Sequence, residues 1–431
     1  MLVMADRQYD VLVVGAGIIG LSSAYHIKQA HPDLSVLIID RGATAGQGDT
    51  AKSNAALRDT FTSTVNRTLA RSTIEFYKHV QFDLGFNLNL DMVGYLWLLS
   101  QKQANELEGV EAEMRRQGTR FRTYDANELS AMILDLTAAP SSQQSRLMEL
   151  DSVEKGLFGI DCGTVAPELI VKFYETELKK LGAEFQYHTE AKSLQLAARK
   201  SLGLPGEPYG WQQKFFREVE TDWGHVRADT IVLCAGTRTP LLLDPAGVDC
   251  MVKPRKNQLF QLGGSSLQRL LSTKGFNEQA TIPFTILPKG GVYFRPVQQE
   301  NSVWASAHAG LGRPFRLEEE PTAEESYYTQ QVSPVLSEYF PCFTNLRPAN
   351  MWAGLYDVNS LDATPIVARV ENCIIAAGMS GSGIMKADAV GRITAALHDN
   401  KEEATLYGNH RIPTAQVGLV NRRVEQEKFV I

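Results

Sequence analysis

The chain has 431 residues, of which 44% are hydrophobic, and it carries a formal net charge of −6 at neutral pH. This length and apolar content allow two domains with sizeable cores and argue against disorder, while the negative charge argues against a general nucleic-acid surface. No apolar segment of the secretory type precedes Tyr9, and no stretch approaches the roughly 18 apolar residues of a membrane span. Five scattered cysteines without a CxxC pair predict reduced thiols in a cytoplasmic protein, with neither a metal site nor a disulfide framework.

An apolar run followed by a glycine-rich turn opens the chain. Residues Tyr9 to Val14 suit a buried parallel strand, and Ile18 to Ala30 predict a helix. Between them, Gly15 allows a tight turn and Gly17 lets the backbone approach a pyrophosphate, while Gly20 lets the helix lie close to the sheet. The pattern predicts a dinucleotide at the amino end of this helix, where free N–H groups and the helix dipole favour phosphate.

A second strand and an acid complete this βαβ unit. Ser35 to Ile39 predict the strand, and Asp40 stands where a carboxylate accepts hydrogen bonds from ribose hydroxyls. An ordinary glycine-rich turn is the weaker alternative because the strand, helix, second strand and acid all have the expected spacing. The expected nucleotide contacts are Gly15, Ala16, Gly17, Ile18, Ile19, Gly20, Asp40 and Arg41.

In the remaining chain, segments typical of a nucleotide-binding domain alternate with segments typical of an antiparallel sheet. Helices are expected over residues 65–80, 101–117, 168–181, 327–340 and 385–398, and further strands over 95–99, 182–187 and 229–236. Residues 197–209 carry glycine and proline and predict an exposed insertion. Short apolar runs at 258–262, 291–295 and 303–307 predict an antiparallel sheet. An apolar strand then meets a second glycine-rich turn over residues 372–383.

Four segments carry a family resemblance, in the same order along essentially the whole chain. They are Ala228 to Gly236, Tyr293 to Pro296, Trp352 to Asp357 and Ile374 to Gly391. They resemble the D-amino acid oxidase/sarcosine oxidase superfamily of FAD-dependent enzymes, and within it the sarcosine/dimethylglycine dehydrogenase-like branch. The segment Trp352 to Asp357 and the C-terminal tail also resemble a mitochondrial flavoprotein required for respiratory complex I assembly.

The resemblance implies an α/β + β fold, in which a Rossmann-like FAD-binding domain is interleaved with an antiparallel-sheet substrate domain. The expected FAD domain is discontinuous and comprises residues 1–86, 155–240 and 350–431. Residues 87–154 and 241–349 are expected to form the substrate domain. The two ends of the chain must therefore meet to form one cofactor site.

The resemblance also implies which residues contact the flavin. The loop from Asp49 to Arg58 matches a loop that runs along the flavin ring, and the turn at Gly378 to Gly383 presents backbone N–H groups to the reduced ring. The flavin contacts so expected are Thr50, Lys52, Ser53, Asn54, Ala55, Ala56, Leu57, Ala191, Ala235, Gly236, Gly354, Gly378, Met379, Ser380, Gly381, Ser382, Gly383, Ile384, Met385 and Lys386. Some relatives tether FAD through a histidine where Asn54 stands or a cysteine near Gly354, so we expect non-covalent FAD.

Candidate substrate groups follow from the charge of small amino and hydroxy acids. A guanidinium or ammonium is expected to bind such an anion, and Arg295 is the first candidate, with a structural salt bridge as its alternative. Arg58 and Lys52 are further candidates beside the flavin. His308 could orient the substrate or accept a proton, and Tyr356 could offer a hydroxyl, although core packing explains either equally well. We cannot name a general base from the sequence.

These features lead to a ranked set of functions. The first is an FAD-dependent dehydrogenase of a small anionic substrate, a secondary or N-methylated amino acid, that passes electrons to a quinone or carrier protein. Trp304 favours a dehydrogenase because it stands where oxidases of this family carry an oxygen-activating lysine. The alternatives are oxidation of glycerol 3-phosphate or a 2-hydroxy acid, and an assembly flavoprotein with structural FAD. We expect the tail, residues 407–431, to pack on the FAD domain, with contact to a membrane surface or a partner protein as the alternative.

Overall fold

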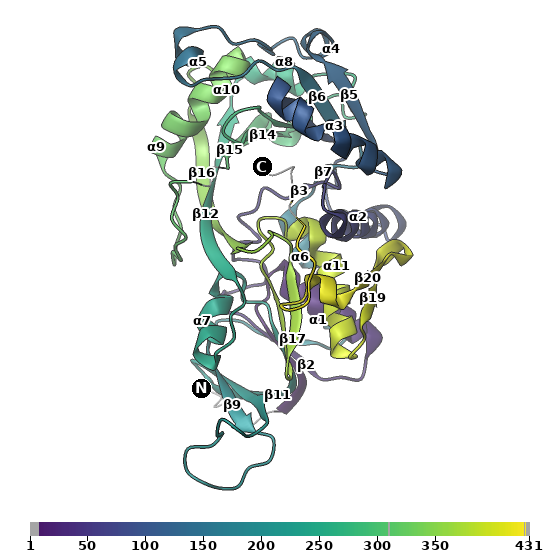
Figure 1. The fold of residues 1–431 in the computed structure, drawn as a ribbon, viewed down its shortest axis with the longest axis vertical. Coiled ribbons are helices and arrows are strands. Elements are labelled where there is room, and N and C mark those ends of the chain that lie inside the picture. Colours follow the sequence, from purple (N-terminus) through teal and green to yellow (C-terminus); the bar gives the residue numbers. More distant parts are fainter. Residues whose placement is uncertain (1–7, 309–310, 426, 428–431) are drawn as a thin grey trace.

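The computed structural model describes residues 8–308, 311–425 and 427, and two large sheets organise them (Figure 1). The first sheet has the order β17 (Ile366–Val370), β18 (Cys373–Ala377), β11 (Gly224–Leu233), β1 (Gln8–Val14), β2 (Val36–Ile39) and β8 (Glu184–Gln186). The strands from β18 to β8 are parallel, and β17 is antiparallel to β18. A hairpin of β9 (Ala191–Ala198) and β10 (Lys214–Thr221) extends from β11. The expected Rossmann-like core is present.

Helices from separate parts of the chain cover one face of this sheet. These helices are α1 (Ile18–Ala30), α2 (Thr64–Lys78), α6 (Pro167–Lys180) and α11 (Ala387–His398). Helix α1 packs against α6 and α11, and α11 packs against α2. A Cβ atom at Gly391 would lie 2.2 Å from Ser22 Oγ, so a glycine is required where α1 meets α11. His26 and the buried Asp388 connect the same helices by a 2.6 Å hydrogen bond.

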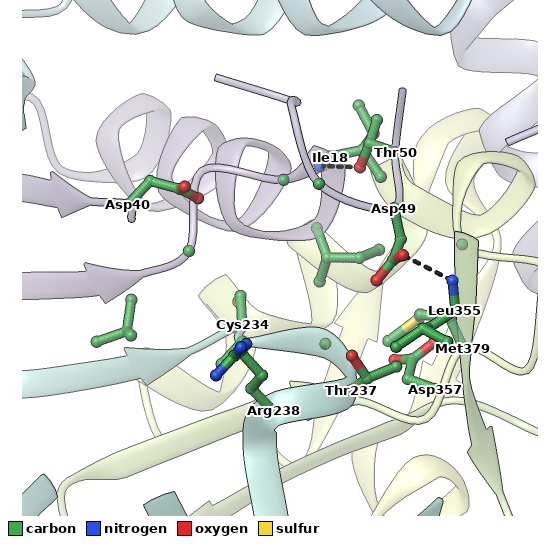
Figure 2. Close-up of a pocket in the computed structure, with 18 of the residues that line it drawn as sticks. Ile18, Asp40, Asp49, Thr50, Cys234, Thr237, Arg238, Leu355, Asp357 and Met379 are labelled. Carbon is green, nitrogen blue, oxygen red and sulfur yellow. Dashed lines mark hydrogen bonds between the residues drawn. The ribbon is translucent and has the colours of Figure 1, made fainter. Parts of the chain in front are cut away.

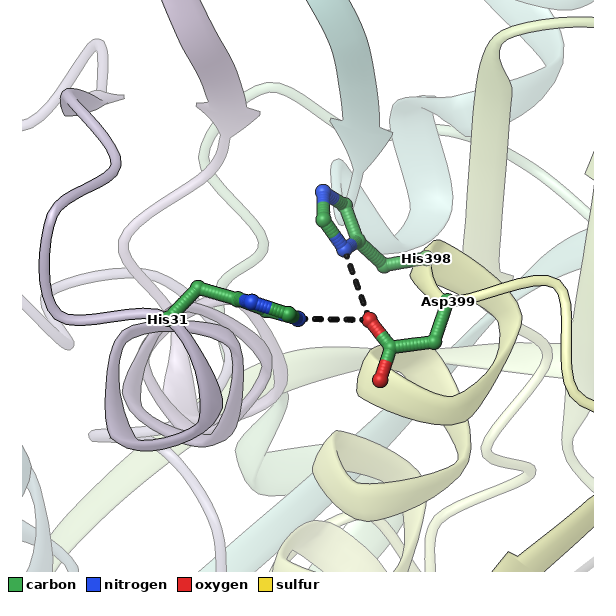
Figure 3. Close-up of side chains that lie close together, drawn as sticks. All are labelled: His31, His398 and Asp399. Atoms are coloured by element: carbon green, nitrogen blue, oxygen red, sulfur yellow. Dashed lines mark hydrogen bonds and ion pairs between the residues drawn. The ribbon is translucent and has the colours of Figure 1, made fainter.

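A second polar contact joins the carboxyl ends of α1 and α11 (Figure 3). Asp399 Oδ1 lies 2.6 Å from His31 Nε2 and 3.2 Å from His398 Nδ1, and Lys401 donates to the other oxygen at 2.8 Å. These donors hold the pKa of Asp399 well below its usual range, against the effect of burial. Both oxygens of this carboxylate therefore already have cationic or imidazole partners, which identifies the cluster as a clamp between the two helices.

The second sheet forms the upper half of the molecule in Figure 1. Its order is β16 (Pro348–Asn359), β12 (Val252–Gly263), β15 (Ser302–Ala307), β14 (Val292–Val297), β13 (Phe284–Ile286), β4 (Tyr95–Leu99), β6 (Lys155–Gly159) and β5 (Phe121–Asp125). The pairs are antiparallel except β13 with β4, so the sheet expected to be antiparallel is mixed at that point. Residues of α4 (Ala126–Met132), α8 (Gln268–Leu271) and α10 (Ser333–Tyr339) share one hydrophobic cluster with this sheet. Helix α3 (Gln101–Arg116) shares another with Tyr95 and Trp97.

The remaining short elements lie between the strands and helices of the two sheets or follow them. They are β3 (Ala56–Leu57), β7 (Gly163–Thr164), β19 (Glu403–Thr405), β20 (Arg411–Pro413), α5 (Gln143–Leu147), α7 (Thr239–Leu243), α9 (Glu325–Tyr327) and the 3-10 turn η8 (Ile384–Lys386). Strands β6 and β16 pair within the second sheet, although the expected domain boundaries at 155 and 350 would assign them to the FAD domain. We propose the same discontinuous division with these boundaries moved beyond β6 and β16. Among the described residues, no helix combines the length and hydrophobicity needed to cross a membrane.

Candidate active site

A cavity of about 380 Å³ lies at the carboxyl ends of β1, β2 and β11 (Figure 2). Residues 354–357 of β16 also line it. Many of the residues predicted to contact the cofactor line it. They are Gly15, Gly17, Ile18, Ile19, Asp40, Arg41, Thr50, Lys52, Ser53, Ala191, Ala235, Gly236, Gly354, Met379, Gly381, Gly383 and Ile384. The other predicted contacts do not line it: Ala16, Gly20, Asn54, Ala55, Ala56, Leu57, Gly378, Ser380, Ser382, Met385 and Lys386.

The glycines of the first turn differ in what surrounds them. A Cβ at Gly15 would lie 2.4 Å from the Cys234 carbonyl oxygen, and Gly15 has a positive φ of 106°. A Cβ at Gly20 would lie 1.8 Å from the Gly15 carbonyl oxygen, so both residues are required by the protein's own backbone. The nearest atom to a Cβ at Gly17 is Thr50 Oγ1 at 3.4 Å. Gly17 therefore leaves room beside the helix terminus, as a bound pyrophosphate requires.

Asp40 is held at the end of β2 by backbone donors. Its Oδ2 accepts a 2.7 Å hydrogen bond from the Ala16 N–H, and its Oδ1 accepts one of 2.7 Å from the Gly42 N–H. A carboxylate has about four acceptor positions, so two well-fixed bonds leave capacity for ribose hydroxyls. Ala16 thus positions the acid, although it does not line the cavity.

Sequence reasoning missed two acids on the cavity wall, Asp49 and Asp357 (Figure 2). Asp49 Oδ1 accepts a 2.7 Å hydrogen bond from the Leu355 N–H, and burial raises the pKa of this carboxyl. Burial, and to a lesser extent the charge of Asp49, raises the pKa of Asp357 to about 7. A share of Asp357 is therefore neutral near pH 7, which reduces repulsion of an anionic cofactor. The motif Trp352 to Asp357 was the available signal, but it did not indicate burial.

Arg238 is a third missed residue, and it lies with Arg41 on the cavity wall. Both guanidinium groups contact Glu319, with 3.2 Å from Arg41 Nη1 to Glu319 Oε2, and Arg238 also approaches Glu190 at 3.5 Å. Guanidinium groups bind phosphate oxygens in pairs of hydrogen bonds. The two arginines therefore supply positive charge where the nucleotide half of the cofactor is expected.

The two loops that the resemblance assigns to the flavin contain unusual backbone conformations. Ala55 has a φ of 49° and Ser380 a φ of 52°, in a region that residues with a Cβ rarely adopt. Ser380 Oγ accepts a 3.0 Å hydrogen bond from the Asn359 N–H and fixes its loop against β16. Gly381 packs on the Tyr356 ring so closely that a Cβ there would lie 2.6 Å from it. Such strain is typical of loops that hold ligands.

Position 354, near which some relatives carry the cysteine that tethers their flavin, is a glycine packed against Lys52. A Cβ at Gly354 would lie 3.0 Å from Lys52 Cβ, and Trp352 Nε1 donates to the Lys52 carbonyl at 3.1 Å. The Asn54 carbonyl accepts a hydrogen bond from Arg295, so this loop is held by its backbone.

We therefore expect FAD to leave the protein on acid denaturation. Precipitation of the purified protein with trichloroacetic acid should leave the flavin absorbance in the supernatant, because neither Asn54 nor Gly354 can form a covalent bond to it. Native protein passed through a desalting column serves as the control. Yellow colour that stays in the washed acid pellet would contradict this expectation.

A pair of buried cations, Arg58 and Lys386, lies around the Phe61 ring. The Arg58 guanidinium lies 3.9 Å and the Lys386 Nζ 5.0 Å from the centroid of the Phe61 ring. Lys386 also donates a 2.7 Å hydrogen bond to Asn66 Oδ1 and is 1% exposed. Burial, with a further contribution from Arg58, lowers the pKa of Lys386 to about 7. Lys386 was predicted as a flavin contact, and in the structure its ammonium group lies over the same Phe61 ring as the Arg58 guanidinium.

Arg295 and three tyrosines of the second sheet form a group that interacts with Arg58. Arg58 and Arg295 both act electrostatically on Tyr95, and burial raises the pKa of Tyr95 well above its usual value. Tyr356 lines the cofactor cavity, and burial, with smaller contributions from Tyr293 and Tyr95, raises its pKa well above the usual value. Burial lowers the pKa of Arg295 to about 10, and its Nε has no hydrogen-bond partner among the described residues. We call this group, Arg58, Tyr95, Tyr293, Arg295, Tyr356 and Lys386, the chamber.

His308 is not brought to the chamber. It is the last described residue before a gap at 309–310, and its backbone N–H donates to the Gly291 carbonyl at 3.1 Å. Burial and then the charge of Arg255 lower its pKa, and no interaction with Arg58 or Arg295 is seen among the described residues.

Comparisons with known proteins agree with this architecture. A family described as FAD dependent oxidoreductase, DAO, matches residues 10–397. FAD-dependent oxidoreductase domain-containing protein 1 of Xenopus laevis is 22% identical over 91% of this chain and 80% of its own length. Sarcosine oxidase subunit beta of Rhodobacter capsulatus is 20% identical, over 95% of this chain and 90% of its own.

Solved structures show the same fold. L-proline dehydrogenase from P. horikoshii has a TM-score of 0.74 at 20% identity, and the match covers 96% of this chain and 97% of that one. Glycine oxidase from Geobacillus kaustophilus has a TM-score of 0.75 at 17% identity, covering 97% and 100%. With the glycine-lined cavity and the match over most of the chain, these findings show that the chain belongs to the DAO family of FAD-dependent oxidoreductases.

Proposed function

We propose that this protein is an FAD-dependent dehydrogenase that oxidises the C–N bond of a small amino acid, with a secondary or N-methylated amine as the preferred substrate class. Relatives named for sarcosine and D-amino acids, and a similar fold named for L-proline, support an amino-acid substrate. Bound FAD would supply the hydride acceptor. The protein must hold the substrate, exclude water and set its charge.

The observation that carries the proposal is the cation pair of Arg58 and Lys386. Both are buried, and η8 places Lys386 two residues after Ile384, which lines the cofactor cavity. A buried positive charge favours a ligand of opposite charge, because a carboxylate offsets the cost of removing that charge from water. A substrate carboxylate bound here would direct the rest of the molecule toward Tyr356 and the cofactor.

The same charges favour the chemically competent form of an amine. Hydride transfer from the carbon requires a neutral nitrogen, and Arg58, Lys386 and Arg295 all oppose a further positive charge. The chamber thereby lowers the pKa of a bound ammonium group, which assists loss of a proton to solvent. The hydroxyls of Tyr293 and Tyr356 can then orient the nitrogen by hydrogen bonds.

The surroundings of Trp304 support a dehydrogenase over an oxidase. Trp304 pairs with Arg295 across β14 and β15, and the Arg295 guanidinium lies 4.6 Å from the Trp304 ring centroid. We take Trp304 as the residue that replaces the oxygen-activating lysine of related oxidases, and we propose that electrons pass to a quinone or a carrier protein.

A substrate panel tests the proposal. The FAD-loaded protein is assayed with sarcosine, proline, glycerol 3-phosphate and 2-hydroxyglutarate, once with dichlorophenolindophenol and once with oxygen alone. We expect turnover of an amino acid with the dye, at least tenfold faster than peroxide formation. Turnover of only glycerol 3-phosphate or 2-hydroxyglutarate would show that the substrate is an alcohol and not an amine. Peroxide formation as fast as dye reduction would identify an oxidase. A flavin that no substrate of a wide panel reduces would favour a structural role for FAD.

A further inference from the structure

The described end of the chain returns to the start of α2. Arg422 anchors this return through a 2.9 Å ion pair with Asp362, and both side chains are buried, at 4% and 1% exposed. Arg422 also donates to the Gly418 carbonyl at 3.3 Å. The segment after Arg422 continues from this anchor to the start of α2, where the Thr62 and Thr64 N–H groups donate to Glu427 and Glu425.

Glu427 places its carboxylate on the residues that precede α2. Its Oε1 accepts hydrogen bonds from the Thr62 N–H at 2.8 Å and the Thr62 hydroxyl at 2.9 Å. Its Oε2 accepts one of 3.0 Å from the Ser63 N–H, and Glu425 accepts one of 2.9 Å from the Thr64 N–H. Three consecutive backbone N–H groups thus bind carboxylates from the C-terminal segment.

This carboxylate is adjacent to the cation pair. Thr62 directly follows Phe61, whose ring lies against both Arg58 and Lys386. The negative charge of Glu427 raises the pKa of both cations and so partly offsets the effect of their burial. Backbone donors thus bind one carboxylate of the protein itself, and the charges of a guanidinium and an ammonium act on it, as they would on a carboxylate ligand.

We propose that Glu427 is an internal competitor that occupies the anion subsite formed by Arg58, Lys386 and the Thr62–Ser63 backbone, and that an anionic ligand must displace it. The inference rests on the proposed function in placing the substrate carboxylate at this subsite. It adds a regulatory element, because any partner or condition that draws the C-terminal segment away increases the affinity of the subsite. The ligand class is a small monocarboxylate, since Glu427 presents a single carboxylate there.

Acetate binding to the FAD-loaded protein tests the inference without turnover. Isothermal titration compares the natural protein with Glu427→Gln, with a chain that ends at Arg423, and with Glu402→Gln, an exposed glutamate outside the subsite. Loss of one competing charge-assisted contact should lower the dissociation constant of acetate about tenfold in the first two variants. Glu402→Gln should match the natural protein.

A peptide supplies a second measurement should the shortened chain fail to fold. A synthetic peptide of residues 421–431 should compete with acetate for Glu427→Gln protein, whereas the same peptide with Gln at position 427 should not. Acetate constants within twofold across all variants, or no acetate binding at all, would overturn the inference. Tenfold shifts in a protein that oxidises no amino acid would instead support the internal competitor and refute the proposed function.

Discussion

Replacing Gly20 by alanine is expected to abolish FAD binding and to lower the free energy of unfolding of the apoprotein by about 3 kcal/mol or more. The added Cβ would lie 1.8 Å from the Gly15 carbonyl oxygen, an atom of the backbone that cannot rotate away. Helix α1 must then move from the end of β1, and its amino terminus leaves the pyrophosphate position. Quenching of flavin fluorescence on titration of the apoprotein measures binding, and urea unfolding measures stability.

Gly17→Ala provides the matched control for this expectation. Its Cβ meets only Thr50 Oγ1 at 3.4 Å, so apoprotein stability should stay within about 1 kcal/mol of the natural value. FAD affinity should nevertheless fall at least tenfold, because the methyl group occupies the space through which the pyrophosphate approaches the backbone. Equal losses of stability in both variants, or unchanged FAD affinity in Gly17→Ala, would contradict the assignment of separate structural and binding roles to these glycines.

Local patterns predicted the elements whose structure depends on neighbours in sequence. Helix α1 has the expected limits, Ile18 to Ala30, and β4 the expected limits, Tyr95 to Leu99, because each apolar run is bounded by a turn or a cap. The glycine turn and Asp40 were found for the same reason, since their chemistry requires a set spacing.

Features that depend on distant pairing were missed. Strand β9 lies partly in the segment expected to be an exposed insertion, because its pairing with β10 crosses a loop of fifteen residues, 199–213. The acidity of Asp357 is set by burial and by Asp49, which is more than 300 residues away in sequence. Glu427 meets Thr62 and Ser63 across 365 and 364 residues. No local pattern carries information of this kind, whereas Arg58 and Lys386 could be named because each follows a recognisable loop.

Lys386→Met should weaken acetate binding, and raise the KM of any amino-acid substrate, by about 50-fold while stabilising the apoprotein at pH 6. A lost charge-assisted hydrogen bond costs roughly 1.5–3 kcal/mol of ligand affinity. The pKa of Lys386 falls from an ordinary value of about 10.4 to about 7 on folding, so retaining the buried charge below pH 7 costs on the order of 4 kcal/mol. That cost exceeds the loss of the hydrogen bond to Asn66.

The pH dependence distinguishes this functional lysine from a structural one. When the pKa of a lysine is lower in the folded protein than in the unfolded protein, the folded protein becomes more stable as pH rises from the folded pKa to the unfolded pKa. The stability advantage of Lys386→Met over the natural protein should therefore shrink between about pH 7 and 10. Acetate affinity of the natural protein should fall as pH rises through 7, because the ammonium deprotonates, and Lys386→Met should lack this step. Lys102→Met, which removes an exposed lysine outside the chamber, controls for charge. If Lys386→Met lowers stability at pH 6 and leaves acetate binding unchanged, the ammonium supports the fold and binds no ligand.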